Sequence, residues 1–172
     1  MAAHRYMVEL HQLKMHFAMK TILAFLLALT LGTSAMAQGG NKQMPEIQLP
    51  DANGNTVKLS SLKGKVVLVD FWASWCGPCR QSMPHLKKLY SEYKSKGFEI
   101  YGISLDESAA PWKRAVKEDG TSWIHVLDTQ GRTAQQFNVQ YIPTSYLIDK
   151  EGKVVAVNAD KDQLEKLVKQ LL

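Results

Sequence analysis

The sequence predicts an α/β fold with a mixed central sheet and helices on both faces of the sheet. Residues 66–72 read VVLVDFW, an apolar run without alternation that is typical of a central strand buried on both faces. Strand patterns then alternate with helix patterns as far as residue 137, which favours parallel pairing. A final strand pair around Lys150-Glu151-Gly152 adds antiparallel pairing, so we expect a mixed sheet.

Two elements flank the central strand in the sequence. Before it, residues 47–49 and 57–59 are predicted to form a small β-hairpin, because Asn53-Gly54 between them is a strong turn signal. After it, residues 77–96 are predicted to form a helix, since their apolar residues recur at helical spacing. Pro84 lies inside this helix and is expected to kink it, and Gly97 is expected to cap its C-terminus.

The rest of the chain is predicted from shorter patterns. Asp160 is expected to cap a final helix whose apolar residues are again helically spaced. The other expected elements, in order, are a strand at 98–104, a short helix at 111–119, a strand at 124–127, a short helix at 133–137, and paired strands at 145–148 and 154–157.

Length and charge restrict the class of protein. The chain has 172 residues, of which 45% are hydrophobic, which suits one packed domain. The net charge is +5, and it falls to +3 without the first 37 residues, since 18 basic and 15 acidic residues then remain. No long basic block is present, so we expect no nucleic-acid partner.

The N-terminus is interpreted as an export signal. Residues 22–31 read ILAFLLALTL, Lys20 precedes them and Ala35-Met36-Ala37 follows, which are the three parts of a secretory signal peptide. We expect cleavage after Ala37, a domain at 38–172 and a soluble extracytoplasmic protein, for instance a periplasmic one, that meets the membrane only through its signal. An uncleaved anchor is the alternative. Residues 1–18 are unusual before a signal, which suggests translation starting at Met15 or Met19.

The two cysteines form a Cys-x-x-Cys motif, Cys76-Gly77-Pro78-Cys79. Disulfide exchange needs one ionised thiol and a second within bonding reach, and a helix N-terminus provides both. Pro78 suits the first helical turn, and Gly77 lets a substrate sulfur approach. A structural pair and half of a metal site are the alternatives. A metal site needs about four ligands. After the predicted cleavage only two histidines, His85 and His125, remain to add to the pair, without matching spacing, so we expect no metal and no cofactor.

The segment VLVDFWASWCGPCR resembles the active-site segment of thioredoxins. From about Pro45 to the C-terminus the chain is similar to the exported TlpA/ResA-like thiol–disulfide oxidoreductases. The similarity includes the hairpin, FEIYGIS followed by a helical insert around Trp112, and the segment IPTSYLID. It implies a thioredoxin-like fold with an N-terminal β-hairpin and a helical insert.

The resemblance also implies roles for individual residues. Asp70 matches the buried acid of thioredoxins, which would exchange a proton with Cys79; a carboxyl inside VVLVDFW should be desolvated, which raises its pKa. Pro143 matches the cis-proline that faces the cysteines, and Ile142 would offer its backbone to an extended substrate. Trp75 would shield the site and, with Gly77 and Pro78, contact substrate.

One position departs from the resemblance. Many ResA-like proteins carry an acid three residues after the second cysteine, where this chain has Ser82. We therefore expect Asp70 to be the only acid that transfers protons at this site. The departure also weakens any substrate specificity inferred from ResA-like proteins. His85 and His125 are interpreted as surface or packing residues.

Several functions fit these residues. We favour a reductase of disulfide-bonded client proteins, since Gly77-Pro78 and Ile142 resemble reducing thioredoxins, and such a reductase needs a membrane electron donor. The alternatives are a thiol oxidant or isomerase, a thiol peroxidase, and a copper carrier. The peroxidase pattern Pro-x-x-x-Thr-x-x-Cys is absent before Cys76, and the short supply of histidines argues against copper.

Overall fold

A computed structural model of the chain describes residues 42–172. The signal peptide predicted at residues 1–37 lies outside the described residues, and its cleavage stays a prediction. In the described part of the chain, no helix is both long and apolar enough to cross a bilayer.

A five-stranded sheet with the order β5-β4-β3-β6-β7 forms the centre of the domain. The middle strand β3 (Val66–Trp72) pairs in parallel with β4 (Phe98–Ser104) and antiparallel with β6 (Thr144–Ile148). At the edges, β5 (Ile124–Leu127) is parallel to β4 and β7 (Val154–Val157) is antiparallel to β6. The predicted mixed sheet and its buried central strand are therefore confirmed, and every residue of β3 is buried.

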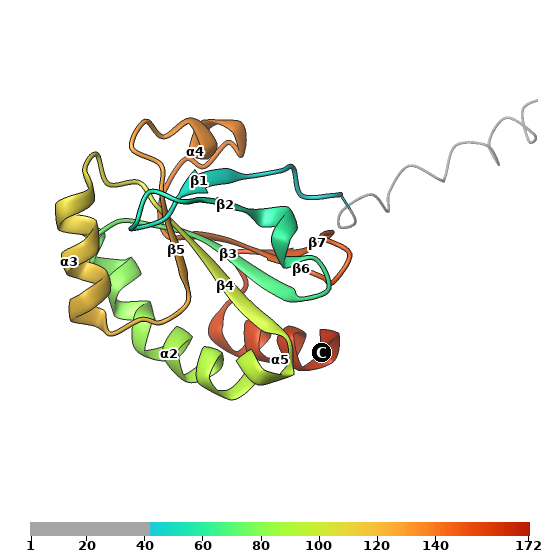
Figure 1. Ribbon diagram of the computed structural model, residues 1–172. Helices are drawn as coiled ribbons and strands as arrows, with labels where there is room; N and C mark the ends of the chain where they lie inside the picture. The colour runs from blue at the N-terminus through green and yellow to red at the C-terminus, as the bar shows by residue number, and fades with distance from the viewer. Residues whose placement is uncertain (1–41) are drawn as a thin grey trace, which may run out of the picture. The chain divides into compact units, whose positions relative to one another are not determined.

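One face of the sheet is covered by helices α2 (Gly77–Tyr93), α3 (Ala109–Asp119) and α5 (Lys161–Leu171). Figure 1 shows α2 and α5 side by side under this face, with α3 near one end of the sheet. Every second residue of each strand points toward this helix-covered face, since side chains alternate along a strand. Leu68 and Trp72 of β3 thus share one core cluster with residues of all three helices.

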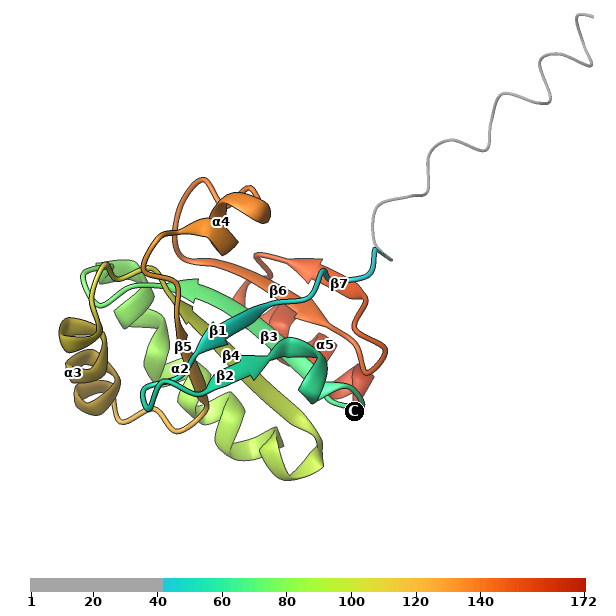
Figure 2. The ribbon, with the colours of Figure 1, turned by 45° about the horizontal axis from the view of Figure 1, so that its top comes forward.

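The opposite face is covered by the N-terminal hairpin, β1 (Gln48–Pro50) and β2 (Thr56–Lys58), together with two short helices, η1 (Leu59–Leu62) and α4 (Arg132–Gln136). Figure 2 shows the hairpin lying across the sheet beside α4. The alternate residues of β3, Val67, Val69 and Phe71, point to this opposite face and pack in a second core cluster. Helices therefore lie on both faces as predicted, but the hairpin and a 3-10 helix share the second face with only one short α-helix.

Most predicted boundaries hold within two residues, and one helix ends earlier than predicted. The helix predicted at 77–96 ends at Tyr93, and the 3-10 helix η2 (Lys94–Lys96) completes it. Gly97 then adopts a φ of 102°, which a residue with a side chain rarely adopts, so the predicted glycine cap is confirmed. Asp160 also caps α5 as predicted, since its carboxylate accepts a hydrogen bond of 2.9 Å from the Gln163 amide.

The first described residues are attached to the turn between β6 and β7. Gln43 forms an isolated antiparallel bridge with Lys153. The Met44 amide donates to the Gly152 carbonyl at 2.9 Å, and the Val154 amide donates to the Lys42 carbonyl at 3.0 Å. The same turn contacts Gly64, just before β3, so this attachment lies at the end of the sheet where β3 begins.

Candidate functional site

Cys76 and Cys79 form a disulfide at the N-terminus of α2, with their Cα atoms 5.3 Å apart. Cys76 is the N-cap residue, and its sulfur accepts a hydrogen bond of 3.2 Å from the Cys79 amide. Pro78 lies in the first helical turn, as predicted, where its missing N–H costs nothing. Unpaired amides and the helix dipole favour negative charge at this point. Once the disulfide is reduced, this position stabilises a thiolate on Cys76.

The disulfide lies just below an exposed loop. Cys76 and Cys79 are 4% and 1% exposed, whereas Trp75 before them is 68% exposed. Gly77 and Pro78 between the two cysteines are also exposed. Both cysteines are buried in the oxidised protein, and Cys76 is the slightly more exposed of the two.

The loop before β6 lies at the same end of the sheet as the disulfide. Phe71 pairs with Thr144, so Pro143 lies beside the end of β3 that leads into the cysteine loop. The Ile142–Pro143 peptide bond is cis, as the resemblance implied. Ile142 packs against the core cluster that contains both cysteines. Tyr141, which the sequence did not single out, is 64% exposed beside it.

Asp70 lies on β3 and is only 6% exposed. It has the same parity as Leu68 and Trp72, and therefore faces the side of the sheet that carries α2 and the disulfide. Burial raises the pKa of its carboxyl to about 7. At neutral pH this group can both accept and release a proton, which is the property expected of it from the sequence.

Sequence reasoning missed a buried carboxylate that holds the cysteine loop. Asp106, 1% exposed, accepts hydrogen bonds from the Ser74 amide at 2.9 Å, the Ser74 hydroxyl at 2.5 Å and the Ser104 hydroxyl at 2.7 Å. Ser74 lies two residues before Cys76. The signal was an acid placed two residues after the buried strand FEIYGIS, at the carboxyl end of β4 that lies beside the carboxyl end of β3.

Arg80, directly after Cys79, joins the same loop to α3. One guanidinium nitrogen donates to the Ser74 carbonyl at 3.2 Å. The Arg80 side chain also forms ion pairs with Asp119 at 2.6 Å and Glu118 at 3.2 Å. Arg80 therefore links the cysteine loop to the helical insert. Its guanidinium binds the Ser74 carbonyl on one side and the carboxylates of α3 on the other.

Replacing Asp106 with alanine is expected to lower the free energy of unfolding by about 1–3 kcal/mol, because the part-buried Ser74 amide and the buried Ser104 hydroxyl lose their acceptor. Urea unfolding of the oxidised protein measures this change. Glu107→Ala is the matched control, since Glu107 is the neighbouring acid and is exposed. Equal stability of the two variants would contradict the role given to Asp106.

Ser82 and His125 make structural contacts outside the cysteine loop. The Ser82 hydroxyl donates to the Cys79 carbonyl at 2.7 Å and so binds the helix backbone. His125 is buried on β5, where it packs against Trp72 and Trp123. Within residues 42–172, no group of three His, Cys, Asp or Glu side chains is placed to hold a metal ion.

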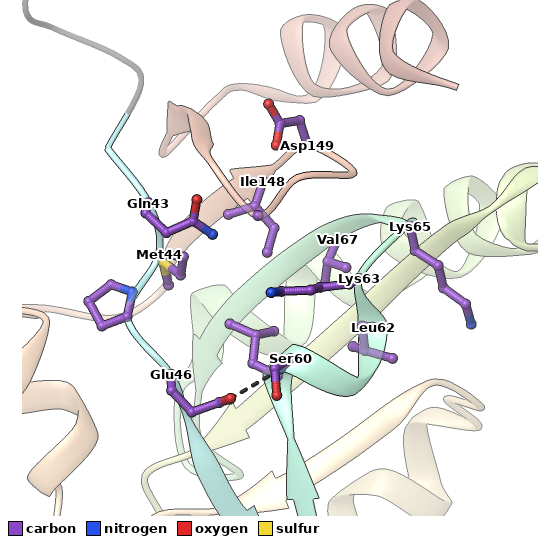
Figure 3. A pocket seen from close by; sticks show the side chains of 13 residues that line it. Gln43, Met44, Glu46, Ser60, Leu62, Lys63, Lys65, Val67, Ile148 and Asp149 are labelled. Carbon is purple, nitrogen blue, oxygen red and sulfur yellow. Dashed lines mark hydrogen bonds between the residues drawn. The ribbon is translucent and has the colours of Figure 1, made fainter.

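A cavity of about 220 Å³ lies at the far end of the sheet from the disulfide. Figure 3 shows Met44, Leu62, Val67 and Ile148 around it and a hydrogen bond from the Ser60 amide to the Glu46 carboxylate, 3.1 Å long. Its lining comes from the start of β3, the end of β6 and the N-terminal segment. The cavity is therefore separate from the cysteine site.

Comparisons with known proteins agree with this geometry. Residues 38–171 match the Redoxin family. Thiol-disulfide oxidoreductase ResA from Bacillus thuringiensis subsp. konkukian (strain 97-27) is 36% identical over 133 residues, which are 76% of this chain and 77% of that protein. The ResA of Bacillus subtilis (strain 168) is 36% identical over 130 residues, 76% of this chain and 72% of that protein.

A solved structure extends the comparison to the fold. The thioredoxin domain of a thiol-disulfide oxidoreductase from Bacteroides vulgatus superposes with a TM-score of 0.72 at 37% identity, covering 78% of this chain and 98% of that domain. The cysteine pair at a helix N-terminus, the five-stranded mixed sheet and these similarities agree. The chain belongs to the Redoxin family and is a thioredoxin-fold thiol–disulfide oxidoreductase similar to ResA.

Proposed function

We propose that this protein reduces disulfide bonds in extracytoplasmic client proteins through its Cys-Gly-Pro-Cys motif. The observation that carries the proposal is the position of Cys76 as the N-cap of α2, beneath an exposed loop and on the sheet face that also holds Asp70. A stabilised thiolate, a resolving thiol and a buried proton acceptor are the three groups that dithiol–disulfide exchange uses.

The exchange has two steps. The Cys76 thiolate attacks one sulfur of the client disulfide, forms a mixed disulfide and releases the other client sulfur as a thiolate, which takes a proton from water. The Cys79 sulfur then attacks Cys76, releases the second client thiolate and forms the Cys76–Cys79 disulfide. Two electrons pass to the client. A membrane electron donor then restores the two thiols of this protein.

Asp70 moves the proton of the resolving cysteine. Cys79 is almost fully buried and must lose its thiol proton before it attacks. The carboxyl of Asp70, with a pKa of about 7, lies on the face of β3 that packs against α2 and accepts that proton. Ser82 carries no charge, so this chain relies on Asp70 alone, whereas many ResA-like proteins carry an acid at the position of Ser82.

The client binds as an extended segment across the exposed loops. Trp75 and Tyr141 are exposed aromatic side chains at this end of the sheet, and Ile142 and Pro143 lie between Tyr141 and β6. The backbone of Ile142 pairs with the client segment beside the reacting sulfur, while Gly77 and Pro78 leave room for the sulfur. Export to the periplasm or a comparable compartment follows from the signal peptide predicted at residues 1–37.

The reduction potential of the Cys76–Cys79 pair tests the direction of electron flow. We expect a value near that of thioredoxin, about −270 mV. A reductase gives up its electrons readily because its disulfide form is stable relative to its dithiol form. Equilibration of the purified protein with dithiol buffers of known potential, followed by mass spectrometry of alkylated thiols, measures it. A potential above about −180 mV would instead assign the protein to the oxidants or isomerases.

A further inference from the structure

The exposed large hydrophobic side chains of residues 42–172 lie at one end of the sheet. They are Trp75, Tyr141 and Val157, which are 68%, 64% and 52% exposed. Trp75 follows β3, Tyr141 precedes β6 and Val157 ends β7. Because β6 is antiparallel to both neighbouring strands, these three points of the chain lie at the end of the sheet that carries the disulfide. Exposed apolar side chains gathered in one region indicate an interaction site.

The side chain of Asn158, directly after β7, binds Tyr141 and β6 at once. Its Nδ2 donates to the Tyr141 hydroxyl oxygen at 3.2 Å, and its Oδ1 accepts from the Ser145 amide at 2.8 Å. The Asn158 backbone amide also donates to the Ser145 carbonyl at 2.9 Å. Since the Ser145 amide needs an acceptor, it determines which side-chain atom is Oδ1, and Nδ2 therefore faces Tyr141. Asn158 thus connects the Tyr141 hydroxyl to the start of β6.

The backbone of Asn158 explains why asparagine suits this position. Its φ is 51°, in the left-handed region that glycine adopts most easily. Asparagine adopts this region more often than most residues with side chains, because its amide can hydrogen-bond to nearby groups. A glycine would fit the same turn and would lose both side-chain contacts. Asparagine therefore allows the turn after β7 and also supplies the donor that Tyr141 receives.

The Tyr141 side chain is held while most of its surface stays exposed. Its hydroxyl is bound by Asn158, and its backbone carbonyl accepts from the Thr144 hydroxyl at 2.7 Å. The residue directly precedes Ile142 and Pro143, and it is 64% exposed. An exposed side chain that is free to change rotamer loses entropy when a partner orders it, which costs affinity. The contact with Asn158 orders the Tyr141 ring before a client arrives.

We propose that Asn158 is a positioning residue for client binding. It holds the Tyr141 ring beside Ile142 and Pro143, and this ring selects client segments that carry an apolar side chain next to their cysteine. A held aromatic ring offers apolar area with little entropy left to lose, so an apolar client side chain that packs on it leaves water at low cost. The inference rests on the proposed function, in which the client segment pairs with the backbone of Ile142.

The contact acts on client binding rather than on the cysteine chemistry. The partners of Asn158 are Ser145 and Tyr141, whereas Cys76 is bound by the Cys79 amide. Release of the Tyr141 hydroxyl therefore leaves the N-cap position of Cys76 as it is. The expected signature is a higher client concentration at half-maximal rate with an unchanged maximal rate, which is how loss of uniform binding shows itself.

The first test measures the selection by the Tyr141 ring. The probes are two disulfide-linked peptide dimers of equal length, in which either leucine or serine flanks the cysteine on both sides. Single turnovers of the protein with reduced cysteines give the rate for each peptide. We expect the wild-type protein to prefer the leucine peptide by about tenfold, which corresponds to partial burial of one leucine. Tyr141→Ala should lose most of this preference. An unchanged preference in Tyr141→Ala would overturn the proposal.

The second test measures the role of Asn158 through three variants. Asn158→Gly suits the left-handed backbone and removes both side-chain bonds. We expect it to raise the half-saturating concentration of the leucine peptide by about two- to tenfold, the cost of ordering one side chain, with the maximal rate unchanged. Asn158→Asp should restore the wild-type value, because a carboxylate accepts from both the Ser145 amide and the Tyr141 hydroxyl. Tyr141→Phe should match Asn158→Gly, and the two changes together should add little.

Asn138→Gly is the matched control. Asn138 is also exposed and also has a φ of 51°, but its side chain accepts from Gln140 at 2.7 Å, so the variant should behave as the wild-type protein. A half-saturating concentration that does not rise in Asn158→Gly would overturn the positioning role. So would an equal loss of rate with bis(2-hydroxyethyl) disulfide, which has no side chain to reach Tyr141. Failure of the proposed function has a different signature, since the wild-type protein would then reduce neither the peptides nor this small disulfide.

Discussion

Replacing Cys76 with serine is expected to lower the rate of disulfide reduction by at least about a thousandfold, because a serine hydroxyl is not ionised at neutral pH and cannot form a disulfide. Cys76 is the N-cap of α2 and the more exposed of the two cysteines, and Cys79, 1% exposed, is too deeply buried to replace it. The measurement is the rate of reduction of a disulfide-bonded model protein by the protein with its cysteines reduced.

Cys79→Ser is expected to behave differently. Cys76 still attacks, but the mixed disulfide with the client cannot be resolved from within the protein. Mass spectrometry after mixing should find one client molecule covalently attached per protein, and Cys76→Ser should give none. If the Cys79→Ser protein turned over repeatedly without accumulating this adduct, or if Cys79 formed the adduct in Cys76→Ser, the assigned order of attack would be wrong.

Asp70→Asn is expected to lower the rate of the resolving step by about a hundredfold near neutral pH, because the amide cannot accept the Cys79 proton. The rate in the wild-type protein should rise as pH increases through about 7, where the buried carboxyl loses its proton. The variant should lack this rise. Single-turnover kinetics of mixed-disulfide decay at several pH values provide the measurement, and an unchanged profile would remove Asp70 from the mechanism.

The same substitution has a consequence for stability, whose sign follows from the raised pKa. The pKa of Asp70 is about 7 in the folded protein against 3.8 for the ordinary side chain, so between these values the native state holds a proton that the unfolded state has lost. The free energy of unfolding of the wild-type protein therefore falls across this window as pH rises, by about 4 kcal/mol in total from this group.

Asp70→Asn removes this penalty. We expect the variant to be more stable than the wild-type protein at pH 8, and the difference to be about 3 kcal/mol larger at pH 8 than at pH 5. Urea unfolding of both oxidised proteins at the two pH values measures the change. A difference that stays constant with pH would mean that Asp70 is ionised throughout, and its place as a proton acceptor at neutral pH would be lost.

The sequence predicts the strands well because the apolar pattern within each strand indicates where the strand begins and ends and how deeply it is buried. The run VVLVDFW can be buried on both faces only in the middle of the sheet, and β3, β4, β5 and β7 begin and end at the predicted residues. The Cys-x-x-Cys pair at a helix N-terminus follows from the same local reasoning, since Pro78 and the preceding strand fix where α2 begins.

What the sequence did not predict depends on contacts between distant segments. Asp106 binds Ser74 across 32 positions of the chain, and no local pattern shows which backbone amide a buried acid will meet. His125 packs against Trp72 and Trp123, which agrees with its interpretation as a packing residue, but these partners become visible only when β3, β4 and β5 are aligned in register. The cis bond before Pro143 was implied by family resemblance alone.

The attachment of the first described residues to the turn between β6 and β7 fixes where the described chain begins relative to the cysteines. Lys42 lies at the end of the sheet where β3 begins, and the disulfide follows the other end of that seven-residue strand, which is about 20 Å long. The described part of the chain therefore begins at the end of the sheet opposite to the cysteines, and the two ends are separated by the length of β3.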